Sequence, residues 1–464
     1  MTRERVTPLP VGFRLRVDAR TRRYDGDRLL VGGSPRHALK LSDRGAAVAG
    51  RLLAGGPIAS TVDGTLARRL VDAGIAQPVP PANTTVSVEV VVPAYDDTRA
   101  LTACLQAIGA DLAVTVVDDG SRNATQLRET VERTGARILR HDDNRGPAAA
   151  RNTGASVATA DVIAFVDSDA AASAASVRAL SLHFADPCVV AVAPRIRPLS
   201  AAIDSTIAAF ASAASPLDQG PDSGVVAPHR RVGYVPSTVL LVRRSAFEAV
   251  GGFDESMRYG EDVDLVWRLI AEGGLVRYDA GIEVHHREPE RWRHWLRRRF
   301  SYGTSAAALS RRHGADAVGL TMQPMPLAVV ALSLARRPRL AAGVVVVTGA
   351  RVARRLGRAG VPAAATAAAA AISPGPAALA AARWLTQLWW PLLLAMAVTS
   401  PRHRRAVAIT ALASPTVMWV SRRPGIDPVG WTLASIADDV AYGLGVWRGC
   451  WRDRTVAPLL PRVR

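Results

Sequence analysis

The alternation of strand-like and helix-like segments between Val86 and Tyr302 constrains the fold of this chain more than any other feature. Short runs rich in Val, Ile and Phe have the length and composition of buried strands, and helix-length stretches separate the first four of them. This alternation predicts βαβ units and an α/β fold around a mostly parallel sheet. The expected strands are VSVEVVVPAY, LAVTVVDDGS, ARILRHD, DVIAFVDSD, VVAVAPRI, STVLLVRR and GIEVHH.

Aspartates stand where two of these strands end. Asp118 and Asp119 close one strand, and Asp167 and Asp169 close another. A buried strand tolerates such carboxylates only where they are paired or bound, and ligands of parallel sheets bind at the carboxyl ends of the strands. An Asp-x-Asp pair suits a hard cation, Mg²⁺ or Mn²⁺, which then binds substrate phosphates. By itself the pair is weak, because Asp-x-Asp is common in turns.

The segments around these strands offer a nucleotide site. In VVPAYDD, Pro93 and Ala94 leave room for a base, and a carboxylate of Asp118 or Asp119 can accept hydrogen bonds from a uracil imide or a ribose hydroxyl. NRGPAAARNTG predicts a helix start that favours an anion. Arg151, one turn into that helix, either reinforces the anion site or anchors the aspartates.

A third motif, GGFDESMRYGEDVDLVWRL, begins another helix with acidic residues. Gly251 and Gly252 allow unusual backbone angles, and Glu261, Asp262 and Asp264 open the helix. Taken singly, carboxylates at a helix start are explained as caps.

In this order and spacing, the motifs strongly resemble the family 2 glycosyltransferases, which have the A-type nucleotide-sugar fold (GT-A). The likeness covers roughly residues 88–287. It implies a metal-dependent inverting transfer in which a nucleotide-diphosphate leaves as the acceptor attacks. The site residues that it implies are Asp262 as general base, Asp96 and Asp119 on the nucleotide, Asp169 on the metal with Asp167 nearby, and His285 or its neighbour His286 as a further metal ligand, with His285 preferred.

The flanking regions differ in composition. Residues 1–85 predict a small α/β or winged-helix module, with Asp63 or Thr65 capping a helix that ends near Gly74, and a linker of the sequence PVPPANTT. This module is somewhat similar to small peptide-recognition modules; the alternative is an extension that supports the fold. Residues 86–312 form the expected catalytic domain, and residues 313–464 an apolar, arginine-rich helical region.

The helical region predicts contact with a membrane. Several of its apolar segments are shorter than the roughly 20 residues of a spanning helix, which favours interfacial or partly inserted helices. Tryptophans near the segment ends resemble interfacial anchors. They are Trp384, Trp389, Trp390 and Trp419. A soluble helical cap on the catalytic domain is the alternative.

Charge and cysteine usage narrow the partners and the compartment. The net charge of +18 is almost all arginine, with Lys40 the only lysine, and the late arginines lie beside apolar segments. That placement suits an anionic membrane surface better than nucleic acid. Three scattered cysteines and an N-terminus without a signal-peptide core predict the reducing cytoplasmic side of the cell membrane.

One branch of the family matches the chain as a whole. LLVGGSPRHALKLS, RRRFSYGTSAA and the arginine-rich apolar tail resemble the glycosyltransferases of the mycofactocin system. This resemblance implies transfer of β-1,4-linked glucose, with UDP-glucose as the expected nucleotide-sugar donor, onto the peptide-derived redox cofactor premycofactocin. The Gln-x-x-Arg-Trp sequence of processive synthases is absent. The alternatives are a cell-envelope glycolipid or polysaccharide transferase and a non-catalytic scaffold that binds sugar nucleotides.

Overall fold

The computed structural model describes residues 7–34, 36–199, 205–314, 321–322, 324–372 and 374–463. The first residue of the expected apolar segment QPMPLAVVALSLA and Ser373 of the alanine-rich segment lie outside these ranges. The chain divides into two compact units. The first comprises Met1–Leu199 and Pro216–Arg287, and the second Ser200–Ser215 and Glu288–Arg464.

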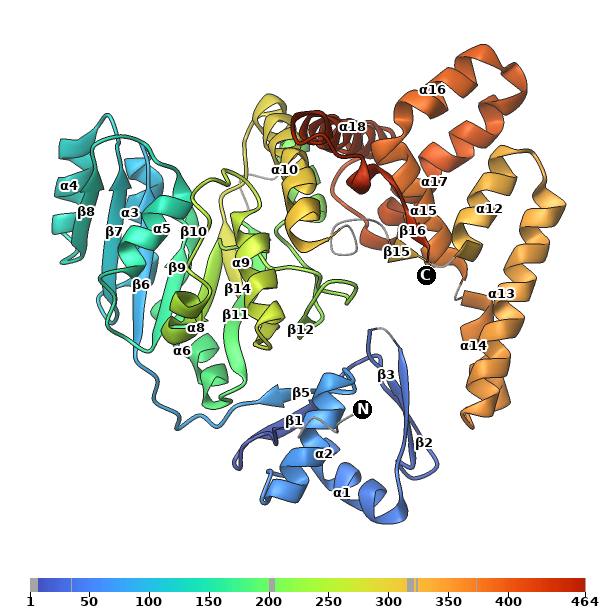
Figure 1. Cartoon of the computed structure of the whole chain (residues 1–464), viewed down its shortest axis with the longest axis horizontal. Coiled ribbons are helices and arrows are strands. Elements are labelled where there is room, and N and C mark those ends of the chain that lie inside the picture. The colour runs from blue at the N-terminus through green and yellow to red at the C-terminus, as the bar shows by residue number, and fades with distance from the viewer. Residues whose placement is uncertain are drawn as a thin grey trace. The chain divides into compact units, whose positions relative to one another are not determined.

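A nine-stranded sheet in the order β10-β14-β11-β13-β9-β6-β7-β8, with β12 against β14, is the centre of the first unit (Figure 1). Its strands are β6 Val88–Ala94, β7 Ala113–Asp119, β8 Arg137–His141, β9 Val162–Val166, β10 Ala170–Ala171, β11 Val189–Pro198, β12 Gly224–Val226, β13 Val239–Arg243 and β14 Leu275–His286. The strands β9, β6, β7 and β8 are parallel neighbours, which confirms the expected α/β fold of GT-A type. The strand β13 runs antiparallel to both β9 and β11, a direction that strand composition alone does not encode.

Helices cover this sheet, so its central strands are buried along their length, and all five residues of β9 are buried. The helices are α3 Thr98–Ile108, α4 Ala124–Glu132, α5 Pro147–Ala155, α6 Ala174–Ser181, η1 Leu182–Ala185, α8 Arg244–Ala249 and α9 Glu261–Ala271. Close packing of α5 depends on Gly154, because a Cβ there would lie 2.3 Å from Cγ1 of Val91 on β6. The short distance between α5 and β6 places Arg151 beneath the ends of the strands.

The N-terminal module has a small core of its own within the first unit. Its elements are β1 Arg14–Val17, β2 Arg22–Tyr24, β3 Leu29–Gly32, β4 His37–Lys40, α1 Asp43–Leu53, α2 Thr61–Asp72 and β5 Ala76–Val79. The hydroxyl of Ser60 caps α2 by accepting from the amide of Asp63, so neither Asp63 nor Thr65 is the cap. Arg68 of α2 forms a buried ion pair with Asp186, 2.7 Å away, in the sheet-bearing part of the unit.

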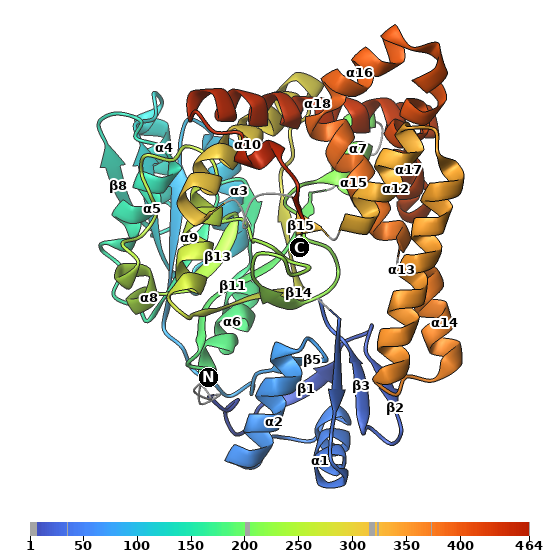
Figure 2. The ribbon, with the colours of Figure 1, turned by 45° about the vertical axis from the view of Figure 1, so that its right-hand side comes forward.

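The second unit is helical (Figure 2). Its elements are α7 Thr206–Ala214, α10 Trp292–His313, β15 Thr321–Met322, α12 Pro324–Leu334, α13 Pro338–Arg358, α14 Ala363–Ile372, α15 Pro374–Leu388, α16 Trp390–Thr399, η2 Pro401–His403, α17 Arg404–Arg422, α18 Pro428–Arg452, η3 Ala457–Leu459 and β16 Arg462–Val463. By length and composition, the helical stretch Ala363–Leu388 is apolar enough to cross a bilayer.

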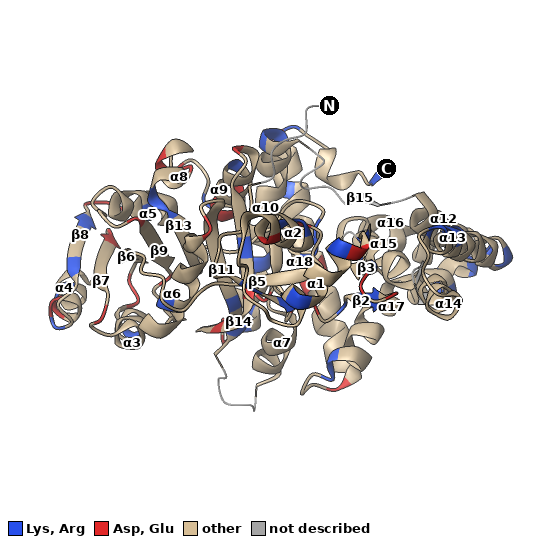
Figure 3. Ribbon diagram, turned by 90° about the horizontal axis from the view of Figure 1, so that it is seen from below, with Lys and Arg blue, Asp and Glu red and all other residues tan. Residues whose placement is uncertain are grey.

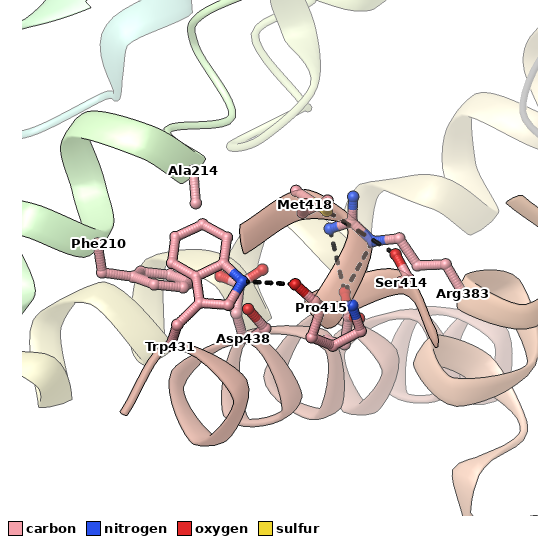
Figure 4. A pocket seen from close by; sticks show the side chains of 10 residues that line it. Phe210, Ala214, Arg383, Ser414, Pro415, Met418, Trp431 and Asp438 are labelled. Atoms are coloured by element: carbon pink, nitrogen blue, oxygen red, sulfur yellow. Dashed lines mark hydrogen bonds and ion pairs between the residues drawn. The ribbon is translucent and has the colours of Figure 1, made fainter. Parts of the chain in front are cut away.

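Charged side chains lie inside this helical unit. Asp438 of α18 accepts from Nε1 of Trp295 at 2.8 Å and from Nε of Arg299 at 2.7 Å, and Asp439 accepts from Arg383 at 3.2 Å. Beside them, a cavity of about 20 Å³ lies next to Trp431, whose Nε1 donates to the carbonyl of Pro415 (Figure 4). The cavity has room for about one water molecule. The buried aspartates and their partners therefore stabilise the packing of the helices.

Candidate active site

Asp96 lies two residues after the end of β6 and has a left-handed backbone with φ of 57°. Its carboxylate accepts from the backbone amide and from Nε of Arg122, both at 2.8 Å. The side-chain hydrogen bond from Arg122 lowers the pKa of Asp96. Pro93 is half-buried in β6. Val91 is the last residue of β6 that pairs with β9, so the missing N–H of Pro93 interrupts no hydrogen bond between β6 and β9.

The two aspartates at the end of β7 are buried and held by protein donors. Asp118 accepts from the amide of Ser121 at 2.9 Å and pairs with Arg140. Asp119 accepts from Nδ1 of His141 at 2.7 Å and from two backbone amides at 2.8–2.9 Å, those of residues 145 and 146 at the start of α5. Both carboxylates therefore order the loops at this edge of the sheet. Contact of either with a nucleotide stays a prediction.

Arg151 joins the strand that carries Asp-x-Asp to the helix that carries the expected base. Its NH2 donates to Asp167 at 2.6 Å and its NH1 to Glu261 at 3.0 Å. The guanidinium is almost fully buried and lies over the ring of Phe253, 5.3 Å from the centroid. Burial alone would lower the pKa of Arg151, but the carboxylates of Asp167, Glu261 and Asp262 raise it. Of the two roles that the sequence left open, the structure places Arg151 on the aspartate.

Asp262 is half-buried in the first turn of α9. Its carboxylate accepts from the amide of Ser237 at 3.2 Å and from that of Val263 at 2.8 Å. Burial raises the pKa of Asp262, and burial together with Asp262 raises the pKa of Glu261 to about 7. Asp264 is fully buried and forms an ion pair with Arg268 at 2.8 Å. Its role is therefore to stabilise the helix, unlike that proposed for Asp262.

Asp169 is the more exposed carboxylate of the Asp-x-Asp pair, with 41% of its side chain exposed, against 25% for Asp167. Nε2 of His286 lies 3.2 Å from Asp169. His285 is exposed, because neighbouring residues of β14 point to opposite faces of the sheet. The geometry thus favours His286 over the preferred His285 as the histidine beside Asp169.

Two further residues of this site, Asn152 and His141, had no predicted role. The side-chain amide of Asn152 exchanges hydrogen bonds of 2.9 Å with the backbone of Phe253. It fixes the Gly-Gly turn, where a Cβ on Gly252 would lie 2.7 Å from Oδ1 of Asn152. His141 links Asp119 to Thr153 of α5 at 2.9 Å. The sequence signal that could have identified His141 is its position at the end of a strand next to the strand of Asp118 and Asp119.

These carboxylates and the histidine form an oxygen-rich edge that fits a divalent cation bound mainly through substrate. Among the residues that the structure describes, no cluster of three or more His, Cys, Asp and Glu side chains could hold a metal on its own. Mg²⁺ commonly takes one or two carboxylates and completes its shell with phosphates and water. Asp169 with His286 and the nearby Asp167 suits that pattern.

Comparisons with known proteins show the family to which the chain is similar. Residues 89–248 match the family model "Glycosyl transferase family 2". The chain is 38% identical over 472 aligned positions, covering 99% of both chains, to the pre-mycofactocin glycosyltransferase of Mycobacterium tuberculosis. A shorter stretch of 58 residues, 12% of this chain and 19% of the relative, is 53% identical to an N-acetylglucosaminyl-diphospho-decaprenol L-rhamnosyltransferase of the same organism.

Solved structures resemble it more distantly. A mannosyltransferase from Pyrobaculum calidifontis in complex with GDP-Man and Mn²⁺ aligns over 80% of this chain and 89% of its own, with 18% identity and a TM-score of 0.47.

Proposed function

This chain belongs to the pre-mycofactocin glycosyltransferases, within glycosyltransferase family 2, and on that premise we propose that it transfers glucose to premycofactocin with inversion at the anomeric carbon. The donor is a nucleotide-diphosphate sugar, UDP-glucose, and repeated transfer builds a β-1,4-linked oligoglucoside. The observation that best supports this chemistry is the pair of contacts made by the guanidinium of Arg151. One nitrogen donates to Asp167 and the other to Glu261, which is the neighbour of Asp262.

Asp262 is the group that we assign as base. Two backbone amides, from Ser237 and Val263, fix its carboxylate, and burial raises its pKa, which strengthens it as a proton acceptor. Asp262 takes the proton of the acceptor hydroxyl as that oxygen attacks the anomeric carbon and the nucleotide diphosphate departs. A single displacement turns an α-linked donor into a β-linked product.

The leaving diphosphate needs positive charge beside Asp169 and His286. We propose that these two residues, with Asp167 nearby, hold Mg²⁺ or Mn²⁺. When bound, the cation neutralises charge that develops on the diphosphate. Arg151 donates to the carboxylate of Asp167 and orients it for that role.

A cell-envelope acceptor is the second candidate, favoured by the large apolar side chains that the helical unit exposes. For either acceptor, we propose that the protein works at the cytoplasmic face of the cell membrane.

The experiment that tests the function incubates the purified protein with UDP-glucose, Mn²⁺ and either premycofactocin or a polyprenyl phosphate. Mass spectrometry is expected to detect a ladder of hexose additions on premycofactocin, and the anomeric proton coupling in NMR to report β linkages. An α-linked product would overturn inversion. Glycosylation of the polyprenyl phosphate alone would overturn the acceptor.

A further inference from the structure

Besides its buried apolar clusters, the helical unit buries aspartates and exposes large apolar side chains. On α18, Asp438 and Asp439 are each only 5% exposed, whereas Val429 and Leu433 are 66% and 64% exposed. Soluble proteins bury apolar side chains and rarely bury aspartate. An apolar exterior over a paired polar interior is the pattern of a surface that meets a non-aqueous partner.

This apolar exterior is most continuous on the pair of helices α16 and α17. The two helices contact each other; α17 also packs against α15 and α18, and α16 lies at the outer end of the helical unit (Figures 1 and 2). Of the residues of α16, only Leu393 is buried. We call the large exposed apolar side chains of this pair the hairpin face; they are Leu392, Leu394, Val398, Ile409, Leu412, Val417 and Val420.

Arginines bracket the hairpin face at both ends of α17. Exposed Arg402 lies between the two helices, exposed Arg404 and Arg405 begin α17, and exposed Arg422 and Arg423 close it. No Asp or Glu occurs between Asp316 and Asp427, so the ribbon of this region carries arginine blue without acidic red in Figure 3. The face is therefore apolar along its middle and cationic at its ends.

We infer that the hairpin face docks on an anionic lipid bilayer, with α16 and α17 lying in the plane of the interface. Leucine, isoleucine and valine enter the boundary of the acyl chains, while the arginines pair with lipid phosphates. A second copy of the chain fits less well, because a two-fold interface through this face would bring the arginine clusters of two protomers together. This inference deepens the proposed membrane location and is independent of the proposed chemistry.

The test uses the full chain in co-sedimentation with two kinds of vesicle, phosphatidylcholine alone and equal parts of phosphatidylcholine and phosphatidylglycerol. The wild-type protein is expected to sediment with the anionic vesicles. Ile409→Asp with Leu412→Asp places charge in the middle of the face, and binding should fall at least about ten-fold, since each buried aliphatic side chain contributes roughly 1.5–3 kcal/mol. The matched control is Val62→Asp, at a 72% exposed position of α2 in the first unit, which should bind as the wild type does.

A second variant leaves helix packing untouched. Arg402→Glu with Arg405→Glu should weaken binding to anionic vesicles about ten-fold or more, because both residues then repel the lipid phosphates instead of attracting them. Charge reversal at exposed Arg128 and Arg137 of the first unit is the control. Equal binding of hairpin and control variants would overturn the inference.

Light scattering without vesicles tests whether the hairpin face binds a second copy of the chain instead of lipid. A wild-type dimer that the hairpin variants dissociate would assign the face to a second copy and overturn lipid docking. Hexose transfer to soluble premycofactocin without vesicles is measured in parallel, and the hairpin variants should retain it. Loss of transfer in the wild type would refute the proposed function and leave vesicle binding intact.

Discussion

At the residue scale, Asp262 can be distinguished from a helix cap by a substitution that preserves the size of its side chain. Asn can accept from the amide of Ser237 or from that of Val263, which donate to different oxygens of Asp262, but it cannot take a proton. Asp262→Asn should lower turnover by roughly 10²–10⁴ and leave calorimetric donor affinity nearly unchanged. The control is Asp427→Asn at the N-cap of α18, where Asp accepts from two backbone amides and Asn caps about as well. Near-normal turnover of Asp262→Asn would move the role to Glu261.

The two histidines at the end of β14 provide a matched pair for the metal. His286→Ala should weaken activation by Mn²⁺ by at least about ten-fold, as loss of a ligand or its support does, because Nε2 of His286 lies beside Asp169. His285→Ala should titrate with Mn²⁺ as the wild type does, since His285 points to the exposed face. Asp169→Ala should abolish transfer while the melting temperature changes little. Turnover that persists in EDTA would refute the metal requirement.

Glu261 makes stability depend on pH. Its pKa in the folded protein is raised to about 7 from an ordinary value of 4.5, mainly by burial and then by Asp262. The folded state thus holds this proton more tightly, so the contribution to stability is full below pH 4.5 and is lost as pH rises toward 7. Gln cannot ionise, so the melting temperature of Glu261→Gln should decrease less between pH 4.5 and pH 7 than that of the wild type. An unchanged slope would contradict the raised pKa.

At the element scale, Arg151 on α5 joins β9 to α9 through its two-branched guanidinium. Arg151→Met should destabilise the fold by roughly 3–5 kcal/mol, because removing one member of a buried ion pair leaves its partners unpaired. Denaturant unfolding measures the loss. Arg28→Met is the control, since its ion pair with Asp43 is largely exposed and such pairs contribute about 0–1 kcal/mol. Equal losses in the two variants would show that the bridge of Arg151 contributes no more than a surface pair.

The Gly-Gly turn before α9 is a second element whose sequence has a structural reason. Gly252 has φ of 69°, and Asn152 occupies the space that a Cβ would need. The turn and α5 are therefore fixed to each other by the side chain of Asn152, next to the start of α9, which carries Asp262.

At the scale of the whole molecule, the helical unit cannot be cut at the predicted boundary of the catalytic domain without loss. A chain that ends after Arg312 retains Trp295 and Arg299 of α10, 0% and 8% exposed, but lacks their partner Asp438. This chain should be insoluble or unfold at a much lower temperature. Asp438→Ala in the full chain should itself cost roughly 3–5 kcal/mol, whereas Asp453→Ala, which pairs with a half-exposed Arg452, should cost less than about 1 kcal/mol. A soluble shortened chain with a wild-type melting temperature would contradict this dependence.

The sequence by itself determined the α/β fold and the residues around which the site is built. Periodicity and β-branched composition predict β6, β7 and β9, because strands in the middle of a parallel sheet are apolar along most of their length; β8 is an edge strand and is less apolar. The Asp-x-Asp pair, the Gly-Gly turn and the acidic start of α9 are local signals with local causes. Their order was sufficient for the family resemblance, which the relative of 38% identity confirms.

Only the tertiary structure decided which of these residues meet. Arg151 and Glu261 are separated by 110 positions, and no local pattern pairs them. The antiparallel direction of β13 and the choice of His286 over His285 beside Asp169 follow from strand pairing across the sheet. Composition predicts that a segment is buried, but direction, register and partners depend on contacts between distant segments, which form only when the chain is folded.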